Sequence, residues 1–239
     1  MLWLGIDDTD TLDTPGTNKL VLHLTRVLAP EMTARLVVRH QLFFDPRIPY
    51  TSHNGAASLL VELRADWSLE ILADRMGSII REWSPAGSDP GLCIAPHVPQ
   101  QVVDFGQRCQ HEVVSQAEAH ALAAEHGLYL ASLGGTGDGV IGALAAVGLL
   151  ATNNDGRVLH QGYGEGEPFD VRGCLPVQEI LRRGVTRVEH LETGESIDQG
   201  NVELSKRLRP NLRNGELILF VKAPEEASCD AEWQAVKVT

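Results

Sequence analysis

Apolar and polar positions along the chain alternate between short strand-like runs and helix-like faces. An apolar run at Leu2–Ile6 predicts a buried strand. After a turn at Pro15–Gly16, apolar residues from Leu20 to Leu28 recur at the spacing of one helix face. The segments Arg35–Phe44 and Ala56–Leu63 are rich in aliphatic residues. They predict two further strands.

The same alternation continues to about residue 150. Helices are predicted after Ser68, a natural N-cap, and after Ser115, which opens a Ser-x-x-Glu capping box. Short strands are predicted at Leu92–Ala95 and Leu128–Leu133, and Val140–Leu150 forms an apolar helix with small residues. Strands alternating with helices indicate an α+β or α/β fold.

The C-terminal third has a more β-rich pattern. Gly162–Pro168 is the best candidate for a linker. A short helix near Val177–Arg183, a hairpin between Thr186–Leu191 and Glu195–Ile197, and a strong strand at Glu216–Lys222 are predicted after it.

Charge limits the classes of partner. The 239 residues carry a net charge of −12, with a pI of about 5.1, which argues against broad non-specific binding to nucleic acid. A local basic patch is still allowed. The most basic groups are Arg182–Arg183, Arg187 and Lys206–Arg207–Arg209, but interleaved acidic residues favour a solvated surface there.

Cysteine usage and hydropathy favour a soluble cytoplasmic protein. The cysteines (Cys93, Cys109, Cys174 and Cys229) lie far apart and form no CxxC pair, so a zinc ribbon or a disulfide framework is not expected. We find no apolar run of about 18 residues that would predict a membrane span, and no basic segment typical of a signal peptide.

Three carboxylates follow the first predicted strand. Asp7, Asp8 and Asp10 repel one another unless a cation or a proton lies between them, and hard carboxylate oxygens are ligands that Mg²⁺ prefers. Side chains alternate along a strand, so all three can converge only if the loop begins near Asp7. A turn capped by Asp10 beside two solvated carboxylates is the structural alternative.

A glycine loop joins the predicted strand at 128–133 to the next helix. Its residues are Gly134, Gly135, Thr136, Gly137, Asp138 and Gly139. Free N–H groups in such a loop at a helix N-terminus can bind phosphate. The loop lacks the lysine of a P-loop and the spacing of GxGxxG, and a tight strand-to-helix turn is the alternative.

Two more groups carry polar side chains near these motifs. The loop from Arg47 to Gly55 contains His53 and Asn54, which could contact a nucleotide or an acceptor, although Asn54–Gly55 could equally form a hairpin turn. Thr17 or Asn18 is a natural N-cap, and the Thr17 hydroxyl could also face a bound phosphate.

Four segments taken in order resemble one family. They are GIDDTD, IPYTSHNGAA, SDPG and GTGDGVIGALAAVG, within roughly Leu2 to Leu150. This order is similar to that of the archaeal 2-agmatinylcytidine synthetases, which modify an isoleucine tRNA. The resemblance implies an ATP-using domain and a ferredoxin-like domain. It also implies that the C2 oxygen of a tRNA cytidine is phosphorylated before agmatine displaces the phosphate.

By position, the resemblance implies that Asp7, Asp8 and Asp10 serve Mg²⁺ and ATP. Thr17 matches a position tied to phosphorylation. Asn54 and Gly55 match the family's Asn-Gly pair. The match to the family's glycine segment covers Gly135, Gly137, Gly142 and Ala143.

The chain departs from the family pattern at several positions. Ser52 and Thr136 stand where the family has arginine, and His53 stands where it has glycine. The segment TPGTN leaves a single threonine, Thr17, at the start of the helix. The 75 residues after Gly164 are few even for the family's OB-fold, and its zinc ribbon has no counterpart. These departures and the low pI disfavour tRNA as the substrate.

We therefore predict a mixed-sheet ATP-using domain (residues 1–55 plus about 132–165), a ferredoxin-like α+β domain (56–131) and a β-rich C-terminal region (166–239). The leading hypothesis is a Mg²⁺-dependent, ATP-using phosphotransferase or ligase-like enzyme that acts on a small or unknown acceptor. Asp8, Thr17 and His53 are its predicted catalytic residues, and the glycine loop and Asn54 would bind the nucleotide. The alternatives are a non-catalytic nucleotide-binding regulatory module and a tRNA-modifying enzyme that needs a partner chain to bind RNA.

Overall fold

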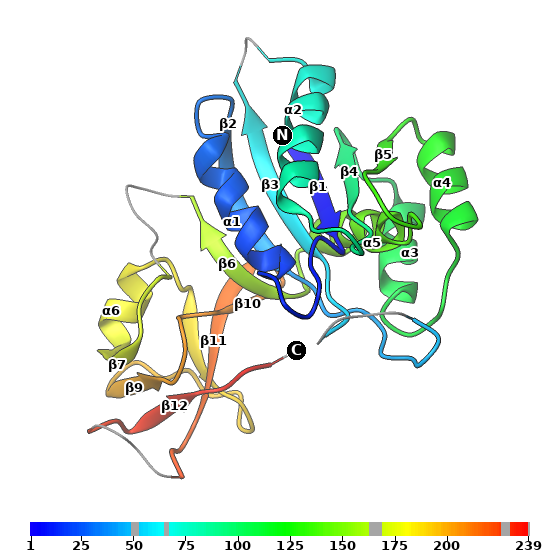
Figure 1. Cartoon of the computed structure of the whole chain (residues 1–239). Helices are drawn as coiled ribbons and strands as arrows, with labels where there is room; N and C mark the ends of the chain where they lie inside the picture. The colour runs from blue at the N-terminus through cyan, green and yellow to red at the C-terminus, as the bar shows by residue number, and fades with distance from the viewer. Residues whose placement is uncertain (49–52, 65–66, 163–168, 226–229, 239) are drawn as a thin grey trace.

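The computed structural model describes residues 1–48, 53–64, 67–162, 169–225 and 230–238 (Figure 1). Most of the predicted linker at 162–168 therefore lies outside the described residues, as do Ser52 and Cys229. Among the described residues, no helix has the length and apolar composition of a membrane span.

The elements run in chain order as follows: β1 (Leu2–Asp7), α1 (Thr17–Val27), β2 (Met32–Arg39), β3 (Ala57–Leu63), α2 (Leu69–Trp83), β4 (Gly91–Ala95), α3 (Gln100–Arg108), α4 (Gln116–Glu125), β5 (Tyr129–Ser132), α5 (Gly139–Ala151), β6 (Arg157–Gln161), β7 (Gly173–Pro176), α6 (Val177–Arg182), β8 (Arg187–His190), β9 (Asn201–Leu204), β10 (Asn211–Arg213), β11 (Glu216–Lys222) and β12 (Trp233–Ala235).

The described strands join into one mixed sheet. Its order is β5-β4-β1-β3-β2-β6-β10-β11-β12-β9-β7, and β8 pairs with β11 beside this path. β1 lies between two antiparallel neighbours, β3 and β4. In the described part of the chain, the parallel pairs are β8 with β11 and β9 with β12. The predicted mixed α/β fold class is confirmed, and its ferredoxin-like detail stays a prediction.

The two faces of β1 pack against different helices, as strand alternation requires. Leu4 and Ile6 point into a core shared with α1 and α2. Gly5 points the other way, where an added Cβ would lie 1.9 Å from the carbonyl oxygen of Ala143 on α5. Asp7 has the same parity as Gly5. The strand register therefore directs Asp7 towards α5.

Helix α5 crosses the sheet at close range. It is apolar all round and almost entirely buried, as expected of a central helix. A Cβ at Gly91 would lie 2.2 Å from the backbone of Gly139, so this approach requires glycine on β4 as well as on β1. Helices α3 and α4 pack against α5 from outside the sheet (Figure 1). The packing fixes the N-terminus of α5 beside the end of β1.

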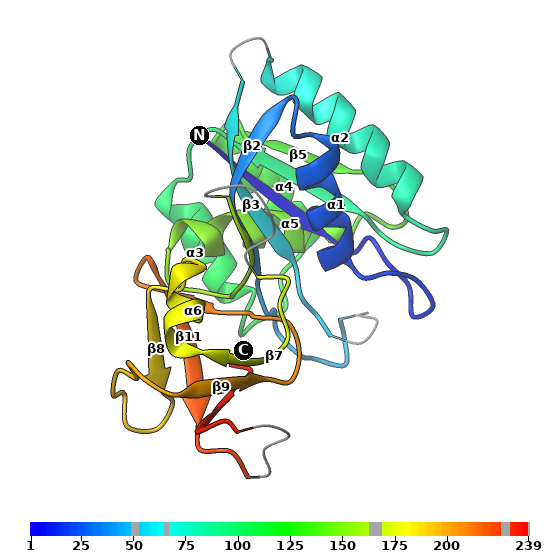
Figure 2. The ribbon, with the colours of Figure 1, turned by 90° about the vertical axis from the view of Figure 1, so that its left-hand side faces the viewer.

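The C-terminal region continues the sheet through β10, which pairs with β6 at Asn211 and Arg157. Its core also includes Val38 and Leu150 from the N-terminal part of the chain. In both views the residues after 169, coloured yellow to red, lie at one end of the N-terminal layers (Figures 1 and 2). This arrangement brings the segment after β9 and the chain end towards α1 and β6.

Most predicted elements are confirmed, but some bounds differ, and strands β7, β9, β10 and β12 were not predicted. The strand predicted at 35–44 spans Met32–Arg39. Beyond it the Leu42 N–H still donates to the carbonyl oxygen of Asn54 at 2.9 Å, whereas the Phe43 N–H donates to that of Cys109 at 2.9 Å. Helix α3, which follows Pro99, was not predicted. The predicted hairpin near Thr193 is present in short form: Glu189 and Ser196 form an antiparallel bridge, and the Ile197 N–H donates to the carbonyl oxygen of Val188 at 2.8 Å. Strand β8 also pairs with β11, which was not predicted.

The predicted division of the chain near residues 55, 131 and 165 stays a prediction. Strand β1 from the first range and strands β3 and β4 from the second share one sheet.

Candidate functional site

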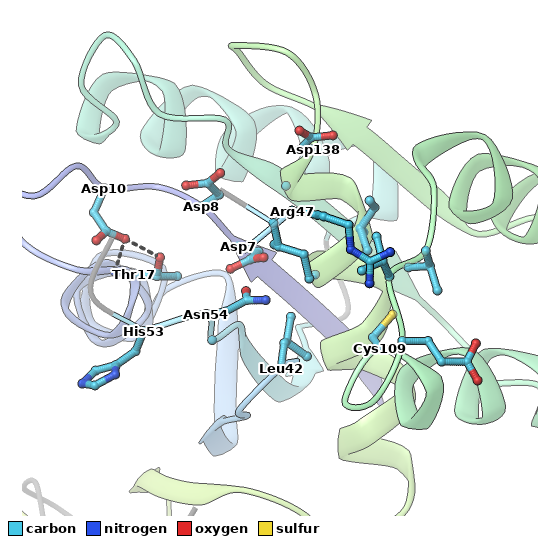
Figure 3. Close-up of a pocket in the computed structure, with 18 residues that line it drawn as sticks. Asp7, Asp8, Asp10, Thr17, Leu42, Arg47, His53, Asn54, Cys109 and Asp138 are labelled. Carbon is cyan, nitrogen blue, oxygen red and sulfur yellow. Dashed lines mark hydrogen bonds between the residues drawn. The ribbon is translucent and has the colours of Figure 1, made fainter. Parts of the chain in front are cut away.

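The three N-terminal carboxylates border one pocket at the end of β1 (Figure 3). The strand ends at Asp7, and Asp8 adopts a left-handed backbone conformation with φ of 54°. This turn meets the requirement that the loop begin near Asp7. The predicted site residues in the pocket lining are Asp7, Asp8, Asp10, Thr17, His53, Asn54, Asp138 and Gly139.

The electrostatics of the pocket favour a proton or a cation. Burial raises the pKa of Asp7 to about 8, with a further contribution from Asp8. The pKa of Asp8 is raised to about 6, first by burial and then by repulsion from the carboxylates of Asp89, Asp10 and Asp138. Both carboxylates would gain from a neighbouring positive charge, because ionised groups of like sign destabilise one another.

Thr17 and Asp10 are joined by hydrogen bonds across the loop. The backbone N–H and the hydroxyl of Thr17 donate to Asp10 Oδ1 at 3.2 and 3.0 Å. The Thr9 hydroxyl donates to Thr17 Oγ1 at 3.1 Å. The predicted N-cap at Thr17 or Asn18 is wrong. The N-cap position is Gly16, which has no side chain, so Asp10 supplies the missing acceptor from the preceding loop.

The glycine loop has the backbone of an anion nest, and a carboxylate of the chain itself fills it. Gly135 and Gly137 have φ of 65° and 94°. The backbone N–H groups of Thr136 and Gly137 both donate to Asp89 Oδ1, the latter at 3.1 Å. Asp138 and Gly139 line the acidic pocket, whereas residues 134–137 do not. The predicted role of the loop in phosphate binding stays a prediction.

Asp89 is a functional candidate that the sequence analysis did not assign. It is the Asp of the SDPG segment, so the motif was visible although its role was not. Its carboxylate both holds the glycine loop and raises the pKa of Asp8.

The loop before β3 contributes side chains from the opposite side of the pocket. The Asn54 side-chain amide donates to the carbonyl oxygen of Phe43 at 2.7 Å, which fixes the loop. Arg47 pairs with Asp45, with Nε to Oδ1 at 2.7 Å. The imidazole of His53 is exposed, lies edge-on to Phe44 and is turned away from the three carboxylates (Figure 3).

Two other reactive-looking groups are structural. Burial raises the pKa of Cys109, which lines the pocket, to about 12, so its thiol stays protonated. His40 bridges Asp155 and Ser58 at 2.5 and 2.7 Å in a row that resembles a catalytic triad. His40 and Ser58 are fully buried, so a substrate cannot reach them.

Among the described residues, no group of three or more His, Cys, Asp or Glu side chains is arranged to hold a metal ion by itself. Asp7 faces α5 and Asp10 faces Thr17, whereas Asp8 lies apart from both (Figure 3). The three carboxylates therefore surround the pocket without converging on one point.

Comparison with known proteins gives one consistent match. No protein-family model matches the chain. A curated protein from Cenarchaeum symbiosum, the isoleucine-tRNA 2-agmatinylcytidine synthetase TiaS, is 27% identical over 150 residues, which cover 62% of this chain and 33% of that protein. The chain resembles TiaS. TiaS from Pyrococcus horikoshii is 29% identical over 157 residues, which cover 64% of this chain and 37% of the relative.

Solved TiaS structures agree with this resemblance. The complex of TiaS with its isoleucine tRNA and ATP matches with a TM-score of 0.55 at 27% identity, over 62% of this chain and 36% of that one. The complex of TiaS with the same tRNA, AMPCPP and agmatine gives 0.53 at 28% identity, over 61% and 35%. The chain spans about a third of the length of the curated TiaS proteins that it matches.

Proposed function

We propose that this chain is an ATP-dependent, ligase-like enzyme that modifies RNA, and that the acidic pocket binds the phosphates of ATP together with Mg²⁺. The observation that carries this proposal is the pocket at the end of β1, where Asp7 and Asp8 have raised pKa values beside the N-terminus of α5. The ATP, AMPCPP and tRNA in the TiaS complexes support it.

The donor set fits a hard divalent cation. Asp7, Asp8 and Asp10 offer carboxylate oxygens, and Mg²⁺ in nucleotide sites is usually held by one or two carboxylates plus substrate phosphates. When bound, Mg²⁺ would offset negative charge on the phosphoryl group that is transferred. The N-terminus of α5 at Gly139 would favour the same anion through the helix dipole.

Thr17 is the residue best placed to meet a phosphoryl group. Its buried hydroxyl donates to Asp10 and accepts from Thr9. A hydroxyl whose proton is held by a carboxylate is a stronger nucleophile or phosphate ligand than a free one. We infer that Asp10 orients Thr17, that Asp8 serves the metal, and that His53 positions the acceptor at the rim.

Calorimetric titration with ATP, with and without Mg²⁺, tests the proposal. We expect binding that requires Mg²⁺ and is lost in Asp8→Asn but kept in Asp13→Asn, because Asp13 is exposed in the following loop and does not line the pocket. Equal affinity of both variants for ATP, or ATP binding that is the same with and without Mg²⁺, would overturn the proposal.

A non-catalytic nucleotide-binding module is the second candidate. Arg47 is the one Lys or Arg among the described residues that line the pocket, and it is paired with Asp45. A transferring phosphoryl group would therefore have few cationic neighbours from the chain. This candidate predicts ATP binding with no release of phosphate or pyrophosphate when tRNA and agmatine are added, whereas the enzyme predicts release.

A further inference from the structure

A second cavity lies between the N-terminal sheet and the C-terminal region. Its volume is about 530 Å³, and ligand-binding clefts typically span roughly 300–1,000 Å³. The N-terminal side contributes Lys19 from α1 and Arg157 from β6. We call this cavity the basic cleft.

The C-terminal region supplies most of the charge in the basic cleft. Its contribution consists of Arg172, Lys206, Arg207, Arg209 and Lys237. Seven of the chain's 20 Lys and Arg residues therefore line one cleft, and its lining contains no Asp or Glu among the described residues. The interleaved acidic residues that favoured a solvated surface around Lys206–Arg209 do not line this cleft.

Few of these cations are neutralised. Arg207 pairs with Asp170, with Nε to Oδ1 at 2.7 Å. Lys19, Lys206 and Lys237 make no ion pair with any residue that the structure describes. The positive charges in the cleft repel one another, although the whole chain has a net charge of −12. This repulsion destabilises the structure unless an anion offsets it.

Burial increases that cost. It lowers the pKa of Arg209 to about 10, with repulsion from Arg207 as the next cause. It also lowers the pKa of Arg157, whose Nε is buried without a hydrogen-bond partner in the described part of the chain. The pKa of Lys237 is lowered by partial burial and then by Arg157. The cleft therefore concentrates positive charge at partly buried positions, as expected of an anion-binding surface.

The lining indicates contacts with phosphates and not with bases. Its uncharged part is aliphatic or small and polar, including Leu159, Leu204 and Leu219, and no described aromatic side chain offers a stacking platform. Cations from β6, α1 and the segment after β9 can each take a different phosphate. A polyanion with several successive phosphates therefore fits better than a single nucleotide.

The basic cleft adjoins the acidic pocket through the first turn of α1. Thr17 lines the acidic pocket, and its neighbours Asn18 and Lys19 line the cleft. Lys237 and Arg157 of the cleft also lower the pKa of His53, after partial desolvation, although His53 borders the acidic pocket. The two sites are thus electrostatically linked at this rim.

We propose that the basic cleft binds the phosphodiester backbone of an RNA strand and leads that strand past His53 to the acidic pocket. The choice of RNA as the polyanion rests on the proposed function. The cleft's own cations would then provide an RNA-binding surface within this chain, without a partner chain.

Fluorescence anisotropy with a fluorescein-labelled, 12-nucleotide single-stranded RNA of mixed sequence tests this proposal on the full chain. The cleft variant is Lys206→Glu with Lys237→Glu, and the control variant is Arg64→Glu with Arg81→Glu. All four side chains are exposed, and both pairs change the net charge by the same amount. We expect the cleft variant to bind at least about tenfold more weakly than wild type and the control to bind nearly as wild type does.

The salt dependence gives a second readout. Each phosphate contact with a single strand contributes a slope of about −0.7 to the plot of log affinity against log salt. Loss of two contacts should make the slope shallower by about 1.4. Equal weakening in both variants, or an unchanged slope in the cleft variant, would overturn the proposal.

Inorganic tripolyphosphate serves as the competitor that separates RNA from a short polyphosphate. If tripolyphosphate binds the cleft and the RNA does not, the RNA assignment is wrong. ATP titration of the cleft variant keeps this outcome separate from the proposed function. Retained Mg²⁺-dependent ATP binding together with lost RNA binding supports both, and loss of ATP binding by Asp8→Asn concerns only the acidic pocket.

Discussion

The carboxylate of Asp7 lies directly against Gly142 on the first turn of α5. A Cβ at residue 142 would stand 1.8 Å from Asp7 Oδ2. The two residues come from the acidic segment and the glycine segment, which are far apart in the chain. The glycine at 142 is therefore what allows a carboxylate to be buried under the helix at the end of β1.

Gly142→Ala should destabilise the protein and disturb the acidic pocket. The new methyl group overlaps Asp7, and overpacking of this kind costs about 1–3 kcal/mol. Gly77→Ala on α2 is the matched control, because its Cβ would meet Arg81 at an ordinary 3.4 Å and alanine favours a helix by up to about 1 kcal/mol. Urea unfolding measures both. Equal stability of the two variants would show that Asp7 moves freely.

The stability of the metal-free protein should fall as the pH rises from about 4 to about 8. The folded-state pKa of Asp7 is raised from 3.8 to about 8, first by burial. Between these two pKa values the folded state keeps a proton that the unfolded state has lost. The stabilisation from this proton is fully present below the pKa of Asp7 in the unfolded state, and it is lost as the pH rises through the pKa of Asp7 in the folded state. At about 1.36 kcal/mol per pKa unit, its ceiling is about 6 kcal/mol.

Asp7→Asn should remove much of that pH dependence, because the amide does not ionise. Denaturant unfolding at several pH values, in EDTA, measures the difference from wild type. Asp13→Asn serves as the control and should keep the wild-type profile, since Asp13 is exposed. A wild-type profile in Asp7→Asn would place the titrating group elsewhere.

Thr17→Ala should lower the free energy of unfolding by about 1–2 kcal/mol. It leaves Asp10 and Thr9 without the hydroxyl that joins them, and buried hydrogen bonds to charged groups are worth about 1.5–3 kcal/mol. Thr17→Ser keeps the hydroxyl and should retain most of the stability and the ATP affinity. If serine behaves as alanine does, the methyl group and not the hydroxyl is what matters.

Asp89→Ala should loosen the glycine loop. The N–H groups of Thr136 and Gly137 lose their shared acceptor, so hydrogen exchange at these two amides should become at least about tenfold faster, and stability should fall by about 1–3 kcal/mol. Asp74→Asn on the exposed side of α2 is the control. Unchanged exchange at residue 136 would mean that the carboxylate does not hold the loop.

Local signals allowed much of the fold to be predicted. Ser68 and Ser115 accept the backbone N–H groups of Ile71 and Glu118, as their positions before apolar helices predict. Helix α3 was not predicted because Pro96 and Pro99 are typical of a loop. In the structure Pro99 is instead the N-cap residue of this helix. The hairpin near Thr193 is present with a short second arm, and the pairing of β8 with the distant β11 is the part that no local signal indicates.

The site was predicted less completely, because it depends on contacts between distant segments. The acidic cluster and Thr17 were visible as motifs. The hydrogen bonds from the glycine loop to Asp89 depend on the sheet order that brings β4 beside β1 and β5. The basic cleft depends on the return of the chain end to α1, which no local pattern of Lys and Arg encodes.

The most direct test of the account is diffraction from crystals soaked with Mn²⁺, as a substitute for Mg²⁺, and AMPCPP. The account predicts an anomalous Mn²⁺ peak in the acidic pocket, bonded to the carboxylate of Asp7 or Asp8 and to phosphate oxygens, with the γ-phosphate near Thr17. A nucleotide bound elsewhere, or Mn²⁺ that contacts none of Asp7, Asp8 and Asp10, would contradict it.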